Sequence, residues 1–199
     1  MGKSSHYFSP SPDVPSRPST VRLDLPDLSL ALRTDRGVFS GARIDPGTRY
    51  LLTTAPPPPR AGHLADIGCG YGPIALTLAT RAPGATVWAV DVNERALELT
   101  QANAAAAGLA NVRVATPDAV PHDVRLAALW SNPPVRVGKA ALHDLLEHWL
   151  GRLDTDGTAV LVVQRNLGSD SLHRWLAARD WSVTRLGSRA GYRLLEVRR

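Results

Sequence analysis

The sequence predicts an α/β fold whose core is a doubly wound, mostly parallel seven-stranded sheet with helices on both faces. The first observation is that, from about residue 60 onward, short apolar runs alternate with longer segments of helical periodicity, which is the pattern of repeated βα units. The second is that seven short runs have the length of strands, and the last two follow one another without an intervening helix. That pair predicts an antiparallel hairpin at one edge of the sheet.

The size and composition of the chain fit one domain. It has 199 residues, of which 44% are hydrophobic and 21% charged, so it can bury a substantial core. The single cysteine, Cys69, can form neither an intrachain disulfide nor a cysteine-based metal site, and it suits a reducing compartment. We find neither an apolar signal region nor an apolar run of about 18 residues, and therefore expect a cytoplasmic protein with no membrane contact.

We expect two parts in the chain. Residues 1–20 are rich in Ser and Pro and bury little apolar surface, which predicts a flexible N-terminal arm. Residues 21–199 form a single predicted domain, with a small β-rich extension over residues 21–55 and a Rossmann-like core over residues 60–199.

Within the extension, apolar residues alternate on both sides of Pro26-Asp27, which predicts two short strands. A turn-rich segment over residues 33–40 follows, and then a short helix over Pro46–Thr53. The four prolines at residues 56–59 predict a stiff, extended spacer before the core.

In the core, strands and helices are expected to alternate, and the carboxyl ends of the strands are expected to border a ligand crevice. The predicted strands are His63–Ile67, Thr86–Asp91, Val112–Ala115, Leu126–Ser131, Ala159–Gln164, Ser182–Leu186 and Tyr192–Val197, and the predicted helices are Pro73–Arg81, Glu94–Ala107, Ala140–Leu153 and Ser169–Arg179.

A glycine-rich loop, Asp66-Ile67-Gly68-Cys69-Gly70-Tyr71-Gly72, joins the first core strand to its helix. Alternate glycines remove the Cβ atoms that would keep a ligand from the backbone, although a structural turn has a similar sequence. The next strand ends in Asp91, which is placed to accept hydrogen bonds from ribose hydroxyls; the alternative is a helix N-cap. Together the two strand ends predict a site for a nucleoside cofactor.

The loop favours S-adenosylmethionine as that cofactor. Its G-x-G-x-G spacing differs from the G-x-G-x-x-G of nicotinamide and flavin sites. Asp66, at the mouth of the loop, would repel a diphosphate but tolerate the cationic sulfonium and amino groups of S-adenosylmethionine. Asp118 follows the third core strand, either as an acceptor for the adenine amino group or as a turn aspartate beside Pro117.

Asn132-Pro133-Pro134, at the end of the fourth core strand, is the predicted catalytic segment. The two prolines fix the backbone after Asn132, so the Asn132 side-chain oxygen and the Pro133 carbonyl can each accept one hydrogen of a planar amine. These contacts strengthen as the nitrogen gains positive charge in the transition state. The alternative is a plain turn.

Charge favours a nucleic-acid substrate. The chain carries a formal net charge of +5, and residues 125–199 hold 12 Lys and Arg against 7 Asp and Glu. Arg136 and Lys139 follow the catalytic segment and are placed to contact RNA phosphates, unless they only solvate the start of a helix. No spacing of His residues predicts a metal site.

With these motifs in view, the chain resembles the small-domain class of S-adenosylmethionine-dependent methyltransferases, a Rossmann-like class I family that includes bacterial ribosomal RNA guanine-N2 methyltransferases and archaeal single-domain relatives. The resemblance covers about residues 6–199. Besides the glycine loop, it is carried by Thr34-Asp35-Arg36-Gly37-Val38-Phe39-Ser40, Ile44-Asp45-Pro46-Gly47-Thr48, Asn132-Pro133-Pro134-Val135-Arg136-Val137-Gly138-Lys139 and Gly191-Tyr192-Arg193-Leu194-Leu195.

The resemblance implies a set of residues for each ligand. The segment from Asp45 to Thr48 would pack near the methionine end of the cofactor, and Phe39 would stack on the target base or else anchor the N-terminal hairpin. The implied substrate residues are Phe39, Arg36, Val135, Arg136 and Lys139, and the implied cofactor residues are Thr48, Asp66, Gly68, Cys69, Gly70, Gly72, Asp91, Val92, Asp118, Ala119 and Asn132.

Val135 stands where adenine, cytosine and glutamine methyltransferases usually carry an aromatic residue, and it resembles the guanine-N2 group instead. We therefore expect a monomeric enzyme that methylates guanine N2 in ribosomal RNA. A methyltransferase acting on protein glutamine or on a small molecule, and a non-catalytic RNA-binding protein, remain alternatives.

Overall fold

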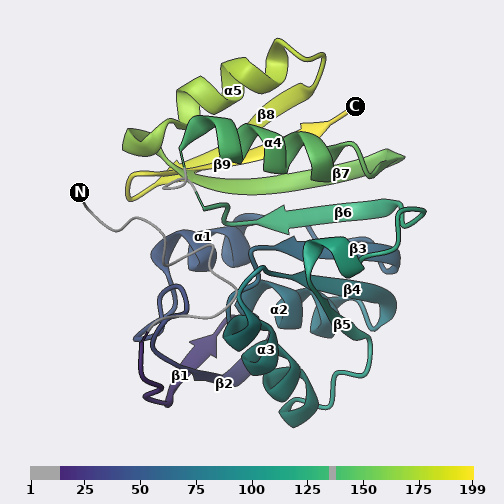
Figure 1. The fold of residues 1–199 in the computed structure, drawn as a ribbon. Helices are drawn as coiled ribbons and strands as arrows, with labels where there is room; N and C mark the ends of the chain where they lie inside the picture. Colours follow the sequence, from purple (N-terminus) through teal and green to yellow (C-terminus); the bar gives the residue numbers. More distant parts are fainter. Residues whose placement is uncertain (1–13, 135–137) are drawn as a thin grey trace.

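The computed structural model describes residues 14–134 and 138–199, and it confirms the predicted architecture of a seven-stranded sheet between two layers of helices (Figure 1). The strands lie in the order β5-β4-β3-β6-β7-β9-β8. Strands β5, β4, β3, β6 and β7 pair in parallel. Strand β9 runs antiparallel to both β7 and β8, and β8 and β9 form the predicted edge hairpin. The bounds are β3 Ala61–Ile67, β4 Gly84–Val90, β5 Val112–Ala115, β6 Leu126–Ser131, β7 Leu153–Gln164, β8 Ser182–Arg189 and β9 Tyr192–Arg198.

The two layers of helices bury separate halves of the core. Successive side chains of a strand point to opposite faces of the sheet. Val160 and Val162 of β7 therefore join one buried cluster, while Leu161 and Val163 join the other. Helices α1 (Pro46–Thr54), α2 (Pro73–Arg81) and α3 (Glu94–Ala106) cover the first face, and α4 (Lys139–Leu150) and α5 (Ser169–Ala177) cover the second (Figure 1).

The topology fixes where a ligand crevice forms. From β3 the chain proceeds outward through β4 to β5, and then returns to place β6 on the other side of β3. The loops that follow β3 and β6 therefore leave the sheet in opposite directions, and in such sheets ligands bind at this switch point, outside the carboxyl ends of the strands. The glycine loop follows β3, and Asn132 follows β6.

The N-terminal extension contains the two predicted strands, β1 (Ser19–Asp24) and β2 (Ser29–Thr34), which pair antiparallel around Pro26-Asp27. Leu23 and Leu32 are fully buried in the core beneath α1, α2 and α3. Because β1 begins at Ser19, the last two residues of the predicted arm belong to a strand, and residues 1–13 lie outside the described residues.

The hairpin is docked on α3 by one buried amide. Asn103 accepts a hydrogen bond from the backbone N–H of Arg33 at 2.7 Å and donates to the carbonyls of Arg33 and Tyr71, both at 2.9 Å. Asn103 thus joins β2, α3 and the glycine loop.

One helix boundary was predicted wrongly. Helix α4 ends at Leu150, not at residue 153, and β7 begins at Leu153, not at residue 159. The buried residues Leu146, Trp149 and Leu150 follow one another at helical spacing. Leu153 continues this spacing in the sequence, which extended the predicted helix, but in the structure it pairs with Leu126 of β6. The residues that follow Leu153 are polar and exposed, so the sequence did not predict this first part of β7. Two 3-10 turns, η1 (Pro117–Ala119) and η3 (Arg165–Leu167), follow β5 and β7.

Candidate active site

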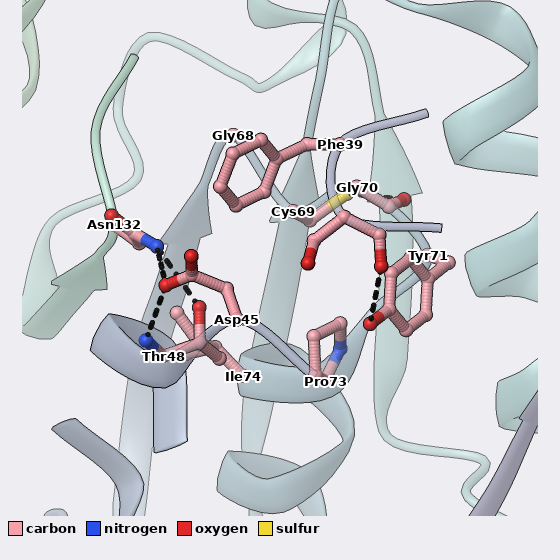
Figure 2. Close-up of a pocket in the computed structure, with 11 residues that line it drawn as sticks. Phe39, Asp45, Thr48, Gly68, Cys69, Gly70, Tyr71, Pro73, Ile74 and Asn132 are labelled. Carbon is pink, nitrogen blue, oxygen red and sulfur yellow. Dashed lines mark hydrogen bonds between the residues drawn. The ribbon is translucent and has the colours of Figure 1, made fainter. Parts of the chain in front are cut away.

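A pocket opens at the carboxyl ends of β3 and β6, where the topology places a ligand crevice (Figure 2). It is formed by the glycine loop, the start of α1, the turn after β6 and the segment between β2 and α1. Its lining residues are Phe39, Ser40, Asp45, Thr48, Gly68, Cys69, Gly70, Tyr71, Pro73, Ile74 and Asn132.

The floor of the pocket is bare backbone at Gly68 and Gly70. Both residues have positive φ, +78° and +58°, which other residues adopt only at a cost. A Cβ atom on Gly70 would meet no atom of the described chain within 4 Å, and one on Gly68 would lie 4.0 Å from Pro134 Cδ. The open space in front of the loop is therefore available to a ligand.

Gly72, a predicted cofactor residue, is not among the residues that line the pocket. It is the N-cap of α2, with φ of +95°, and a Cβ atom there would lie 2.7 Å from Leu76 Cδ1 and 3.1 Å from the Thr100 side chain. A side chain at this position would meet protein atoms, so the glycine serves the close packing of α2 and α3.

Asp91 holds the glycine loop in shape. Its Oδ2 accepts from the Gly70 N–H at 2.9 Å and its Oδ1 from the Asn93 N–H at 3.0 Å. Burial raises the pKa of Asp91 above its ordinary value, although these backbone donors counteract part of the rise. The N-cap of α3 is Asn93, not Asp91. Each carboxylate oxygen can accept more than one hydrogen bond, so both oxygens of Asp91 can still accept hydrogen bonds from ribose hydroxyls.

Asp66 was expected at the mouth of the loop, but the structure buries it completely beneath the loop. Its Oδ2 accepts from the Ala75 N–H in the first turn of α2 at 2.9 Å, and its Oδ1 has no hydrogen-bond partner in the described part of the chain. Burial raises the pKa of Asp66 to about 8, and the nearby Asp91 adds to the rise.

Cys69 lines the pocket but is not a reactive thiol. It is 3% exposed, and its Sγ lies 3.7 Å from the Thr100 hydroxyl. Burial raises the pKa of the Cys69 thiol well above its ordinary value. Because the thiolate is the reactive form, the residue contributes packing and backbone to the site.

Asn132 is held by the N-terminus of α1. Its side-chain nitrogen donates to Asp45 Oδ2 at 2.9 Å and to Thr48 Oγ1 at 3.0 Å (Figure 2). The same Asp45 oxygen caps α1 by accepting from the Thr48 N–H at 2.9 Å. Since a carboxylate can only accept, the nitrogen end of the amide faces Asp45, and the oxygen end accepts no hydrogen bond from the residues that the structure describes.

The segment between β2 and α1, which borders the pocket, is anchored at both ends. The Tyr71 hydroxyl donates to the carbonyls of Ser40 and Arg43 at 3.5 and 3.4 Å. Burial raises the pKa of Tyr71, which keeps this hydroxyl protonated. Phe39 lies in this segment, lines the pocket and is 47% exposed. That exposure contradicts the alternative role as a core anchor of the hairpin.

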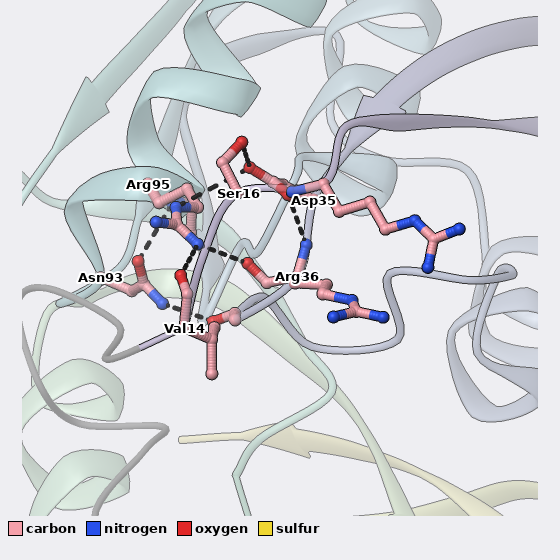
Figure 3. A network of polar contacts seen from close by, with 9 residues as sticks. Val14, Ser16, Asp35, Arg36, Asn93 and Arg95 are labelled. Atoms are coloured by element: carbon pink, nitrogen blue, oxygen red, sulfur yellow. Dashed lines mark hydrogen bonds and ion pairs between the residues drawn. The ribbon is translucent and has the colours of Figure 1, made fainter.

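The other end of this segment is fixed by a polar network around Asp35 and Arg95 (Figure 3). Asp35 accepts from the Ser16 hydroxyl at 2.6 Å and from the backbone of Arg17 and Arg36. Arg95 of α3 donates to the carbonyls of Val14 and Arg36 at 3.1 and 2.8 Å. Burial favours a higher pKa for Asp35, but these donors outweigh it and leave its pKa below the ordinary value.

Several predicted site residues do not line the pocket. Asp118 and Ala119 are exposed in η1, and Arg36 and Lys139 are exposed as well. Val92 is half-buried after β4. Of the two prolines in the predicted catalytic segment, Pro133 is buried and Pro134 is half-buried. The predicted substrate residues Val135 and Arg136 lie outside the described residues. No group of residues suited to a metal ion occurs among the described ones, and no helix described here has the length and apolar run to span a membrane.

Sequence reasoning missed Ser40, Tyr71, Pro73 and Ile74 as pocket residues, and it placed the segment from Asp45 to Thr48 near the cofactor only through the resemblance. Asp45 carried a detectable signal, because Asp before a proline that opens a helix indicates an N-cap. Its contact with Asn132, 87 positions along the chain, left no local signal.

The chain is similar to known proteins over nearly all of its length. A family model described as methyltransferase small domain matches residues 29–196. The uncharacterized protein YbxB of Bacillus subtilis is 33% identical over 199 residues, which cover 98% of this chain and 99% of that protein. The ribosomal RNA small subunit methyltransferase C of Shewanella amazonensis is 31% identical over 153 residues, which cover 75% of this chain and 44% of that protein.

Among solved structures, the 16S rRNA N2 G1207 methyltransferase of T. thermophilus, in complex with AdoMet and guanosine, superposes with a TM-score of 0.76 at 23% identity. The match covers 94% of this chain and 52% of that one. The chain thus spans nearly all of YbxB but only about half of the two larger proteins.

Proposed function

The chain belongs to the methyltransferase small-domain family, and from that premise we propose that it transfers a methyl group from S-adenosylmethionine to an exocyclic amino group of an RNA base. Guanine N2 in ribosomal RNA is the acceptor that the relatives favour. The observation that carries the proposal is the Asn132 amide, whose oxygen is left for an N–H donor at the rim of a pocket floored by Gly68 and Gly70.

The pocket residues fit the cofactor. Open space lies in front of Gly70, and the positive φ of both floor glycines keeps side chains out of it. Asp91 borders the loop with two carboxylate oxygens suited to ribose hydroxyls. Asp45 and Thr48 supply oxygen atoms near Asn132 for a cationic methionine end. When bound, S-adenosylmethionine supplies an electrophilic methyl group on a sulfonium that leaves as a neutral thioether.

The protein's part in the reaction is to align and desolvate the amine. Asn132 Oδ1 and the Pro133 carbonyl each accept one of its hydrogens, which aims the nitrogen lone pair at the methyl group. As the N–C bond forms and the S–C bond breaks, nitrogen gains positive charge and both acceptors hold it more strongly. The methylated amine then releases one proton to water, so no strong base is required.

A base must leave its helix or loop to reach this pocket, because a stacked base hides its amino group from an enclosed site. Phe39, 47% exposed at the rim, offers a ring on which a base can stack. Its segment is fixed at both ends, by Tyr71 and by the Asp35 network. The rim thus provides a preformed platform next to Asn132.

The test is transfer of labelled methyl groups from S-adenosylmethionine to ribosomal subunits, free ribosomal RNA and a protein fraction, each prepared from a strain that lacks the gene. We expect label in RNA, recovered after digestion as N2-methylguanosine. Label confined to protein would refute the RNA substrate, and failure to bind S-adenosylmethionine in calorimetry would refute the enzyme altogether.

A further inference from the structure

We propose that Asp45 is a positioning residue that sets which end of the Asn132 amide faces the target amine. The inference rests on the proposed function, in which Asn132 Oδ1 accepts an amine hydrogen. It concerns a residue of the N-terminal extension, outside the strand and loop that carry Asn132 itself.

The contacts leave the amide one favourable orientation. A side-chain amide has two N–H groups, and in Asn132 they are directed to Asp45 Oδ2 at 2.9 Å and Thr48 Oγ1 at 3.0 Å. An amide turned by half a rotation has nearly the same shape, but it would set Oδ1 against the Asp45 carboxylate and lose a charge-assisted hydrogen bond. It would also present a donor to the substrate amine, which is itself a donor.

Asp45 is itself firmly held. It caps α1, whose first residue, Pro46, has a fixed φ. A Cβ atom on Gly47 would lie 2.5 Å from the Tyr192 ring, so α1 begins directly against β9. The Tyr192 hydroxyl in turn accepts from the Gln164 side chain at 2.9 Å. A continuous row of contacts therefore leads from the end of β7 through β9 and α1 to Asn132, which gives the terminal Gly191-Tyr192 motif a role in the site.

The key variant separates capping from positioning. Asp45→Ser keeps a good N-cap residue for α1, but one short hydroxyl cannot reach both the Thr48 N–H and the Asn132 amide. We expect its Tm within a few degrees of the wild type, while kcat, measured at saturating S-adenosylmethionine, falls about tenfold to a hundredfold for the lost charge-assisted contact. Wild-type kcat in Asp45→Ser would overturn the proposal.

The matched control is Asp45→Asn, which retains an acceptor oxygen of the same reach for both partners. We expect its kcat to lie within about threefold of the wild type, because the hydrogen bond from the Asn132 amide to residue 45 is restored. If Asp45→Asn is as slow as Asp45→Ser, the carboxylate charge acts directly and the positioning role is wrong.

A double-mutant cycle tests whether Asp45 acts through Asn132. Residues that act through one another are not additive, so Asp45→Ser should lower kcat no further when Asn132 is already Ala. A full additional loss in the double variant would show that Asp45 works independently and would overturn the inference.

A spectroscopic arm separates this inference from the proposed function. In ligand-free protein labelled with ¹⁵N, the Asn132 side-chain signals are those that vanish in Asn132→Ala. We expect both of their protons to exchange slowly with water in the wild type and faster in Asp45→Ser. An unchanged Asn132 signal overturns the positioning role, whereas a changed signal in a protein that methylates no RNA supports the positioning and refutes only the assigned substrate.

Discussion

Asn132 presents an oxygen to the pocket because its nitrogen is bound to Asp45 and Thr48. The position of the side chain alone would not decide whether the pocket meets an acceptor or a donor, since an amide turned by half a rotation would occupy the same space. At the scale of single residues, the acceptor specificity of the site therefore depends on hydrogen bonds whose direction is set by a carboxylate.

Replacing Asn132 should affect the chemical step selectively. In Asn132→Ala one acceptor for the developing positive charge is lost, so we expect kcat to fall by about two orders of magnitude or more, as for other single transition-state contacts. Calorimetry should give a Kd for S-adenosylmethionine within about threefold of the wild type. Unchanged turnover would show that Asn132 does not hold the amine.

Asp66 should make stability depend on pH. Its pKa in the folded protein is raised to about 8, above the value of an exposed carboxyl, so between about pH 4 and pH 8 the folded state binds more protons than the unfolded state. The free energy of unfolding should therefore decrease as pH rises through this window, by at most about 1.4 kcal/mol per pH unit from this group.

Asp66→Asn provides the measurement. The Asn side chain can still accept from the Ala75 N–H but does not titrate, so chemical denaturation at pH 6 and pH 8.5 should show the variant gaining on the wild type at the higher pH. Parallel pH profiles for the two proteins would contradict the raised pKa.

At the scale of elements, the strand-turn-helix unit around the glycine loop has two kinds of glycine. Gly70 faces open space, whereas Gly72 faces Leu76 and Thr100 at the start of α2. The regular G-x-G-x-G spacing therefore combines a position that is open to a ligand with one that allows close packing of helices, and the sequence alone cannot separate the two.

Matched alanine substitutions should separate these two purposes. Both positions have positive φ, so each variant incurs about 1–2 kcal/mol of backbone strain. Gly72→Ala adds a clash within the core and should lose more stability than Gly70→Ala in urea titrations. Gly70→Ala should lose more affinity for S-adenosylmethionine in calorimetry, because its methyl group enters the pocket. The reverse ranking would refute the assignment.

The elements near the loop were predictable because their signals are local. The glycine spacing, the strand before it and Asp91 at the next strand end follow from patterns within about one turn or strand of each other. The contact between Asp45 and Asn132 was not predictable, because it joins two segments that only the packing of α1 against β7 and β9 brings together. Asp66 was placed at the wrong depth for a related reason: burial depends on the helix packed above it.

At the scale of the whole molecule, unpaired basic side chains flank the pocket on the β7 side. Lys139 begins α4, Arg165 follows β7 and Arg189 ends β8 next to Tyr192, so all three lie toward the carboxyl edge of the parallel strands. Each is exposed, and none forms an ion pair within the described chain. Asp154 and Asp156 are exposed near the opposite end of β7, where Arg125 and Arg198 are exposed as well.

The three exposed basic residues at the carboxyl edge predict where the phosphates of the proposed RNA substrate bind. If the strand that carries the target base runs from the pocket over β7 and β9, Arg165→Gln and Arg189→Gln should each weaken RNA binding and lower the slope of log Kd against log salt by about 0.7, the value for one phosphate contact to a single strand. Arg125→Gln is the matched control, because Arg125 is equally exposed but precedes β6 at the opposite edge. The measurement is the Kd for RNA by fluorescence anisotropy, taken for each variant between low and moderate salt. Equal effects of all three substitutions would indicate diffuse attraction by net charge, and would exclude a defined path for RNA across the carboxyl edge.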